Sequence, residues 1–190
     1  MSKRAKVIAL AAPSGGGKST MAKRLLNEFP DLKFSVSATT RPLRKGEVDG
    51  KDYHFLSKEE FQNKIDTGEF LEWEEFYKGT RYGTLQSDVE YQLNKGYFIL
   101  LDIDVLGALN IKNIYRDEAL TLFISPPSLQ ILEERLRNRD TETEETLKTR
   151  LDRAQKEISY SDKFDTVVVN DDLETAYSEI KEAVKHFMNS

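Results

Sequence analysis

The stretch KVIALAAPSGGGKSTMAKRLLNEF, residues 6–29, decides the fold of this chain. It begins with a short apolar run, continues through a glycine-rich turn, and ends with apolar residues at helical spacing. Ala12, Gly17, Lys18 and Ser19 occupy the defined positions of the loop pattern G-x-x-x-x-G-K-[ST], with alanine in place of the first glycine. A strand, such a loop and a helix in this order open an α/β protein with a parallel sheet.

The residue types in this loop suit the binding of a triphosphate. The glycines at 15–17 let backbone N–H groups wrap closely around phosphate oxygens, and the following helix directs its positive end toward them. Lys18 would reach the β- and γ-phosphates, and the hydroxyl of Ser19 would bind Mg²⁺. The alternative is an ordinary glycine-rich turn in which Ser19 or Thr20 caps the helix.

Length and composition restrict the class of protein. The 190 residues suffice for one domain with insertions, and the lack of cysteine excludes disulfides, zinc–thiolate sites and thiol nucleophiles. The formal net charge of −5 argues against bulk nucleic-acid binding, but not against small anions, because clustered arginines can oppose the net sign. No segment resembles a transmembrane span or a signal sequence, so we expect a soluble, cytoplasmic protein.

Five apolar segments predict a parallel sheet with helices on both faces. The run YFILLD, for example, has no polar side, which is typical of a strand buried on both faces. The five segments are residues 6–12, 33–37, 97–102, 119–124 and 164–169. Helices are expected between them, at 87–94 with Ser87 as N-cap and Gly96 as stop, and at 104–112, 128–138 and 173–187.

Residues 38–86 interrupt the alternation of strand and helix. Strand-like runs at 52–56, 70–77 and 81–85 surround a short helical pattern at 58–67. The charged and turn-forming residues at the start of this block are typical of a binding surface or of a solvated loop. We interpret the block as a small α+β insertion that carries the binding site for the acceptor of the phosphoryl group.

Two further features have both a functional and an ordinary interpretation. Asp102 ends a buried strand, at the sheet edge where the phosphate loop also lies, so it can support the Mg²⁺ or cap the next helix. The arginines within residues 135–151 can belong to a mobile lid that closes on nucleotide phosphates, or to a solvated charged face.

The chain closely resembles guanylate kinases over nearly its whole length. The resemblance rests on ordered segments: APSGGGKST at 12–20, SVSATTRPLRKGEVDGKDYHF at 35–55, EFLEW at 69–73, YGT at 82–84, LDIDVLGA at 101–108, RLRNRDTETEET at 135–146 and VVVNDDL at 167–173. It implies a P-loop NTPase-type fold, with a core of residues 1–37 and 87–190, a GMP-binding domain of residues 38–86 and a helical lid at about 136–150. The implied reaction moves the γ-phosphoryl group of ATP to GMP, and also to dGMP, in purine metabolism, with Mg²⁺ as cofactor.

The same resemblance implies which residues act. Those that would bind ATP are Pro13, Ser14, Gly15, Gly16, Gly17, Lys18, Ser19, Thr20, Arg135, Arg139 and Asn170. Those that would bind GMP are Ser37, Arg41, Arg44, Glu47, Tyr53, Glu72, Tyr82, Thr84 and Asp104. Those that would carry the transfer are Lys18, Arg41, Arg135, Arg139 and Arg150. Ser19 and Asp102 would hold the Mg²⁺, directly or through water.

The residue types of the implied guanine site match the hydrogen-bonding groups of guanine. Guanine offers a carbonyl oxygen and N–H donors, so Ser37 would meet O6, Glu72 would accept from N1 and N2, and Thr84 would assist. Glu47 would orient the arginines, and Asp104 would steady either Arg41 or the guanine amino group. From the residues alone, the favoured interpretation of Glu72 is a solvent-facing member of an acidic strand.

Three departures from the family pattern qualify these expectations. Ala12 replaces the first loop glycine, which is tolerable if its φ is negative. Leu106 replaces a common glutamine, and Asp140 replaces a glycine in the lid.

Two rival interpretations of the function are a non-catalytic guanylate-kinase-like module that binds phosphopeptides and a kinase for another nucleoside monophosphate. The protein is expected to be a monomer or homodimer.

Overall fold

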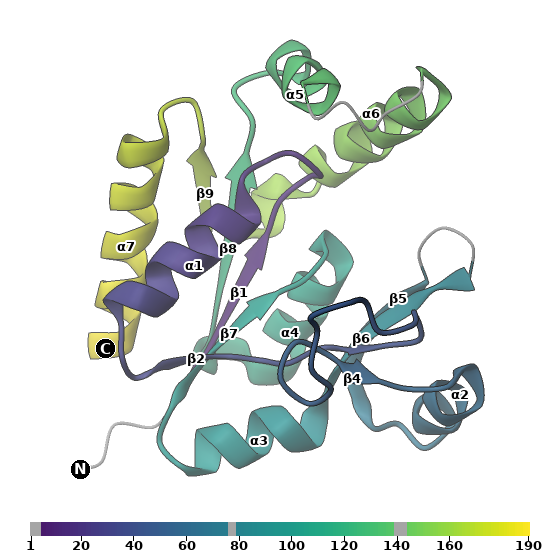
Figure 1. Cartoon of the computed structure of the whole chain (residues 1–190). Coiled ribbons are helices and arrows are strands. Elements are labelled where there is room, and N and C mark those ends of the chain that lie inside the picture. Colours follow the sequence, from purple (N-terminus) through teal and green to yellow (C-terminus); the bar gives the residue numbers. More distant parts are fainter. Residues whose placement is uncertain (1–4, 76–78, 139–143) are drawn as a thin grey trace.

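The computed structural model of this chain describes residues 5–75, 79–138 and 144–190, and its strands form two sheets (Figure 1). The larger sheet is parallel throughout. Its strand order is β2 (Leu32–Phe34), β7 (Phe98–Asp102), β1 (Val7–Ala11), β8 (Ala119–Ser125) and β9 (Thr166–Val169). All five predicted strands are therefore confirmed as members of one sheet, although β2 ends before Ser37.

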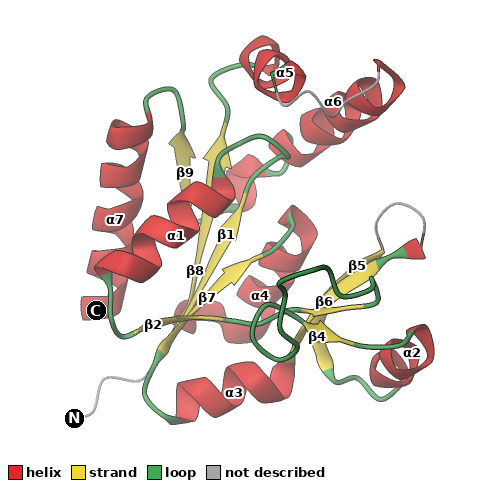
Figure 2. Cartoon of the chain, viewed as in Figure 1, coloured by secondary structure: helices red, strands yellow, loops and turns green. Residues whose placement is uncertain are grey.

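Helices cover both faces of this sheet (Figure 2). On one face lie α1 (Lys18–Glu28) and α7 (Leu173–Asn189), and on the other lie α3 (Gln86–Asn94) and α4 (Val105–Tyr115). Within β1, Ile8 and Leu10 enter the first core, whereas Val7 and Ala9 enter the second. A strand buried on both faces needs the continuous apolar run seen in the sequence.

The smaller sheet belongs to the segment that interrupts the α/β alternation. Its order is β4 (His54–Phe55), β3 (Ala38–Thr39), β6 (Arg81–Leu85) and β5 (Phe70–Glu75). It packs on α2 (Lys58–Asp66), where the ring of Phe61 stacks on that of Phe70 at 4.4 Å. Asn110 of α4 donates a hydrogen bond of 2.6 Å to the carbonyl of Leu71, which ties this sheet to the larger one.

Two helices lie beyond the carboxyl ends of β1 and β8 (Figure 1). These are α5 (Leu129–Arg137) and α6 (Glu144–Ile158), which pack through Leu132, Leu136 and Leu147. Short 3₁₀ helices, η2 (Arg116–Glu118) and η3 (Ser161–Lys163), precede β8 and β9. The expected lid therefore falls on the end of α5 and the first half of α6, and part of it, including Arg139 and Asp140, lies outside the described residues.

Several expected element boundaries were wrong. Helix α3 begins at Gln86 with Leu85 at its N-cap, so Ser87 lies inside the first turn and does not cap it. The strand expected at 52–56 is reduced to two residues, and α4 runs three residues beyond the expected 112. Within the described part of the chain, no helix combines the length and apolarity needed to span a membrane.

Candidate active site

A cleft of about 780 Å³ lies between the phosphate loop and the smaller sheet. Its walls come from the loop after β1, the loop after β3, the strands β5 and β6, the end of β7, and α6. Carboxyl ends of parallel strands form one edge of a sheet, and this edge supplies the floor of the cleft. The arrangement brings the phosphate loop and the loop after β3, which carries Arg41 and Arg44, to one cavity.

The phosphate loop has the backbone that its glycines predict. Gly15 and Gly17 have φ values of 90° and 98°, in the region that favours glycine. A Cβ on Gly16 would lie 2.9 Å from the carbonyl oxygen of Pro13. Arg116 is the sole described non-glycine residue with a positive φ, so Ala12 has a negative φ and its methyl group packs in the core. The departure at Ala12 therefore preserves the loop.

The helix that follows begins without a side-chain cap. Gly17 occupies the N-cap of α1 and no side chain accepts a hydrogen bond there, so the ordinary interpretation, in which Ser19 or Thr20 caps the helix, was wrong. The uncapped N–H groups face the cleft, which Lys18, Ser19 and Thr20 also line. Such a helix end favours an anion.

Lys18 lies between the loop and the end of β7. Its Nζ donates to the carbonyl oxygen of Ile103 at 2.6 Å and lies 2.7 Å from Oδ1 of Asp102. Asp102 does not cap α4, because Asp104 does so by accepting from the N–H of Gly107 at 2.9 Å. The ammonium group is thus held beside the phosphate loop before any phosphate is present.

Asn170 holds the loop from behind. Its Nδ2 donates to the carbonyl oxygen of Gly16 at 2.9 Å, and its side chain is buried. A Cβ on Gly17 would lie only 2.4 Å from this nitrogen. Arg135 of α5 donates to the backbone carbonyl of Asn170 at 2.9 Å. Asn170 therefore contacts the base of the loop, and Arg135 contacts Asn170 in turn.

The loop after β3 contains an arginine that is held by a carboxylate. Arg41 donates to both carboxylate oxygens of Glu47, at 2.7 and 2.5 Å, and its guanidinium lies 4.8 Å from the ring centre of Tyr53. The backbone N–H of Arg44 also donates to Glu47. Arg41, followed by this N–H, lowers the pKa of Glu47 to about 2. Glu47 thus pairs with Arg41 through both of its oxygens, and Tyr82 packs edge-on against Tyr53.

Glu72 lies deeper in the cleft, on β5. Thr84 of β6 donates to its Oε1 at 2.5 Å, and a Cβ on Gly107 would lie 3.0 Å from its Oε2. Burial raises the pKa of Glu72 to about 7, and the neighbouring Asp104 and Glu74 add to this effect. A carboxyl in this setting is not a solvent-facing strand residue. Ser37 lines the same cleft from the segment between β2 and β3.

Glu74 and Arg153 are charged residues of the cleft that escaped the sequence analysis. Arg153 of α6 donates to both oxygens of Glu74 on β5, at 2.8 and 3.0 Å. Spacing could have revealed both, because Glu74 shares a strand face with Glu72 and Arg153 follows Arg150 by about one helical turn. Arg150 itself donates to Oγ of Ser14 in the phosphate loop at 2.9 Å.

A glycine-rich phosphate cradle and an arginine-containing acceptor pocket that share one cleft define a P-loop nucleotide kinase. Residues 4–187 match the family model for guanylate kinase. The chain is 53% identical to a guanylate kinase of Salinibacter ruber over 184 residues, which cover 97% of each protein. It is 49% identical to one of Chlorobium luteolum over 185 residues, or 97% of this chain and 93% of that one.

Structure comparison agrees with these relatives. A crystal structure of guanylate kinase from Anaplasma phagocytophilum matches with a TM-score of 0.77 at 34% identity, and covers 99% of this chain and 88% of that one. The chain belongs to the guanylate kinase family, whose members are ATP-dependent kinases of GMP.

Proposed function

We propose that the cleft moves the γ-phosphoryl group of ATP to GMP, and also to dGMP, giving ADP and GDP or dGDP for purine nucleotide metabolism in the cytoplasm. The observation that carries this proposal is the placing of Lys18 and Glu72 in one cavity. The first belongs to a loop built for donor phosphates, and the second is a buried acceptor suited to the N–H donors of guanine.

The donor half binds ATP through backbone and cationic groups. The loop from Pro13 to Thr20 surrounds the phosphates, and Lys18 leaves Asp102 for the β- and γ-phosphates. Arg150, already at Ser14, and the lid arginines Arg135 and Arg139 neutralise charge on the transferring group. Asn170 lies behind the loop, near the adenine end of the site.

The acceptor half binds GMP at two points. Its phosphate, a dianion, is held by Arg41 and Arg44 and by the hydroxyls of Tyr53 and Tyr82. Glu47 keeps the Arg41 guanidinium in place for this contact.

The guanine base meets a separate set of groups. Ser37 donates to O6, Glu72 accepts from N1 and N2, and Thr84 supports the Glu72 carboxylate. Asp104 supports this pocket from the N-cap of α4. A base without those donors leaves the buried Glu72 unpaired, which disfavours AMP.

Ser19 and Asp102 fit a Mg²⁺ ion that accompanies ATP. Their hydroxyl and carboxylate oxygens are the hard ligands that this ion prefers, and both residues line the cleft beside the phosphate loop. When bound, Mg²⁺ would supply positive charge that offsets the charge of the phosphates. Asp102 becomes free to face it, directly or through water, once Lys18 turns to the phosphates.

The chain's residues act by positioning and electrostatics. The attacking oxygen of GMP is already anionic, so the site needs no strong base. Residues 38–86 form the GMP-binding unit, residues 1–37 and 87–190 the core, and about 136–150 the lid. Closure of the lid with both substrates bound excludes water, which prevents hydrolysis of ATP.

A coupled assay of ADP formation tests this function with ATP and one of GMP, dGMP, AMP or UMP. We expect turnover with GMP and dGMP, because no residue assigned here reads the 2′-hydroxyl. A preference for AMP or UMP would contradict the roles of Ser37 and Glu72.

A further inference from the structure

Arg153 lies in the wall of the cleft, where its guanidinium contacts two carboxylates. It projects from the middle of α6, and its Nη2 contacts both oxygens of Glu74 at 2.8 and 3.0 Å. Its Nε donates to Oε1 of Glu157, one turn further along the helix, at 2.8 Å. Two carboxylates thus fix the guanidinium plane, as bidentate pairing does elsewhere.

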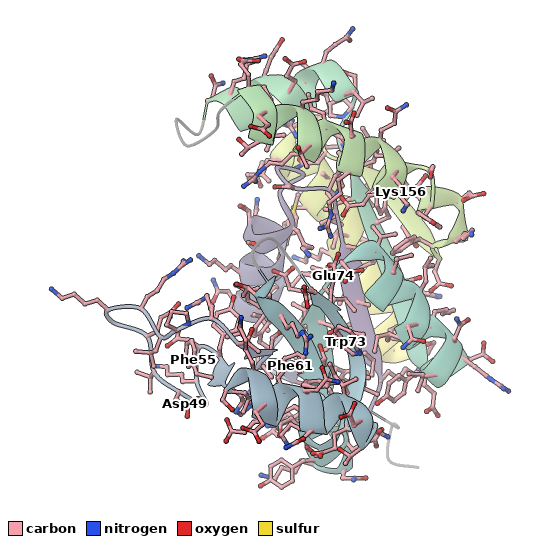
Figure 3. The ribbon with its side chains drawn as sticks, turned by 90° about the vertical axis from the view of Figure 1, so that its right-hand side faces the viewer. Asp49, Phe55, Phe61, Trp73, Glu74 and Lys156 are labelled. Carbon is pink, nitrogen blue, oxygen red and sulfur yellow. The ribbon has the colours of Figure 1, made fainter. Side chains whose placement is uncertain are left out.

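Glu74 is the acceptor-side end of this contact. It lies on β5 two residues beyond Glu72, and in Figure 3 it is found at the part of the smaller sheet nearest α6, above Trp73. Burial and the neighbouring Asp104 raise the pKa of Glu74, whereas Arg153 opposes this rise. Arg153 therefore supplies positive charge to a wall that already holds several carboxylates.

The same helix carries Arg150 to the donor side. Arg150 precedes Arg153 by three residues, so both side chains leave one side of α6 and both line the cleft. Its Nη1 donates to Oγ of Ser14 in the phosphate loop at 2.9 Å. An adjacent side of α6 packs through Leu147 and Leu151 on the apolar cluster that includes Leu132 and Leu136 of α5.

These contacts give α6 a fixed position across the cleft. We propose that Arg153 is a positioning residue, which ties α6 to the acceptor strand β5 through Glu74 and so holds Arg150 at the phosphate loop. The inference rests on the proposed role of Arg150 in phosphoryl transfer. It adds a link by which the donor and acceptor halves are assembled together, and it assigns Arg153 no contact with substrate.

Steady-state kinetics of single and double variants test this link. We expect R153M and E74Q each to lower kcat about tenfold, because displacement of a catalytic cation by a fraction of an ångström has that cost. KM for GMP should stay within about twofold, since neither side chain binds it. R153K, which keeps the charge beside Glu74, should recover most of the lost kcat.

The decisive comparison uses R150A as background. If Arg153 acts through Arg150, R153M lowers kcat no further in R150A, and E74Q adds nothing in R153M. E75Q and R24M are matched controls on exposed pairs, with Arg81 and Glu174 respectively, and should retain kcat within about twofold.

Other outcomes overturn the inference. Additive losses in R150A and R153M would show that Arg153 acts independently of Arg150. An unchanged kcat in R153M, with only a lower melting temperature, would make the pair merely structural. If R150A alone retains full kcat, the proposed role of Arg150 fails and this inference fails with it. A different preferred nucleotide would refute the proposed function but leave the cycle measurable with that nucleotide.

Discussion

The Nζ of Lys18 lies 2.7 Å from Oδ1 of Asp102, in a half-buried pair that joins the first turn of α1 to the end of β7. The pair places a cation and a carboxylate at the edge of the phosphate loop. In the proposed function Lys18 turns to the nucleotide phosphates and Asp102 faces the metal, and in this structure each charge neutralises the other. This ion pair explains how the charged Lys18 side chain is stabilised beside an open cleft.

Replacement of Lys18 should abolish turnover without unfolding the chain. We expect Lys18→Ala to lower kcat by at least about a hundredfold, since a cation directed at developing charge is lost. Far-UV circular dichroism should be unchanged, because the side chain contributes to no core cluster. Lys23→Ala on the exposed side of α1 is the control. Retained activity in Lys18→Ala would refute the role of the loop.

Removal of the metal should stop the reaction. Chelation with excess EDTA is expected to abolish ADP formation, and added Mg²⁺ should restore it. Asp102→Asn should raise the Mg²⁺ concentration needed for half-maximal rate about tenfold, because one anionic oxygen is lost. Full activity in EDTA, or an unchanged Mg²⁺ requirement in Asp102→Asn, would contradict the assignment of Asp102.

The pH profile should report the ionisation of Glu72. Its carboxyl has a pKa of about 7, and only the ionised form accepts from both N1–H and N2–H₂ of guanine. We therefore expect kcat/KM for GMP to be about tenfold lower at pH 6 than at pH 8. The Glu72→Gln variant serves as control, since it keeps the titration of the GMP phosphate but loses this step. A wild-type profile identical to that of Glu72→Gln would argue against the prediction.

The same group should lower stability as pH rises. The folded protein retains the Glu72 proton up to about pH 7, whereas the unfolded chain releases it near the ordinary glutamate pKa of 4.5. The unfolded state thus binds fewer protons in this window, so the contribution of Glu72 to the free energy of unfolding falls between these two pH values. Glu72→Gln should exceed wild type at pH 8 by up to about 3 kcal/mol in urea unfolding. Equal stabilities at pH 8 would rule this out.

Loss of the Glu47 carboxylate should weaken GMP binding. Glu47→Gln removes the charge that holds the Arg41 guanidinium in its bidentate contact. We expect KM for GMP to rise about tenfold, with a smaller effect on KM for ATP. Glu59→Gln, on the exposed side of α2, should leave both values unchanged. An equal rise in both KM values would point to a general loss of structure.

Gly17 should be irreplaceable for two separable reasons. Alanine there must adopt a φ of 98°, and its Cβ would meet Nδ2 of Asn170 at 2.4 Å. Gly68 has a φ of 71° but open space around it, so Gly68→Ala isolates the backbone cost of about 1–2 kcal/mol in stability. We expect Gly17→Ala to lose kcat/KM for ATP by at least about a hundredfold in addition. Similar activity in the two variants would contradict the conclusion that the contact with Asn170 makes a side chain at position 17 intolerable.

The sequence was sufficient for features that depend on local pattern. Continuous apolar runs predicted the five strands of the parallel sheet, because strands buried on both faces cannot carry polar residues. The glycines at 15 and 17 predicted the loop, since their positive φ is a local backbone requirement. The ordered family segments then indicated the acceptor.

Tertiary structure decided how side chains far apart in sequence meet. Helix α3 begins at Gln86 because β6 ends at Leu85. The local capping pattern at Ser87 did not predict this start. The burial of Glu72 beneath Gly107, and the pairing of Arg153 with Glu74, depend on how α4 and α6 pack on the cleft. Local propensity fixes elements and loops, whereas the electrostatics of the site arise from long-range packing that only the folded chain provides.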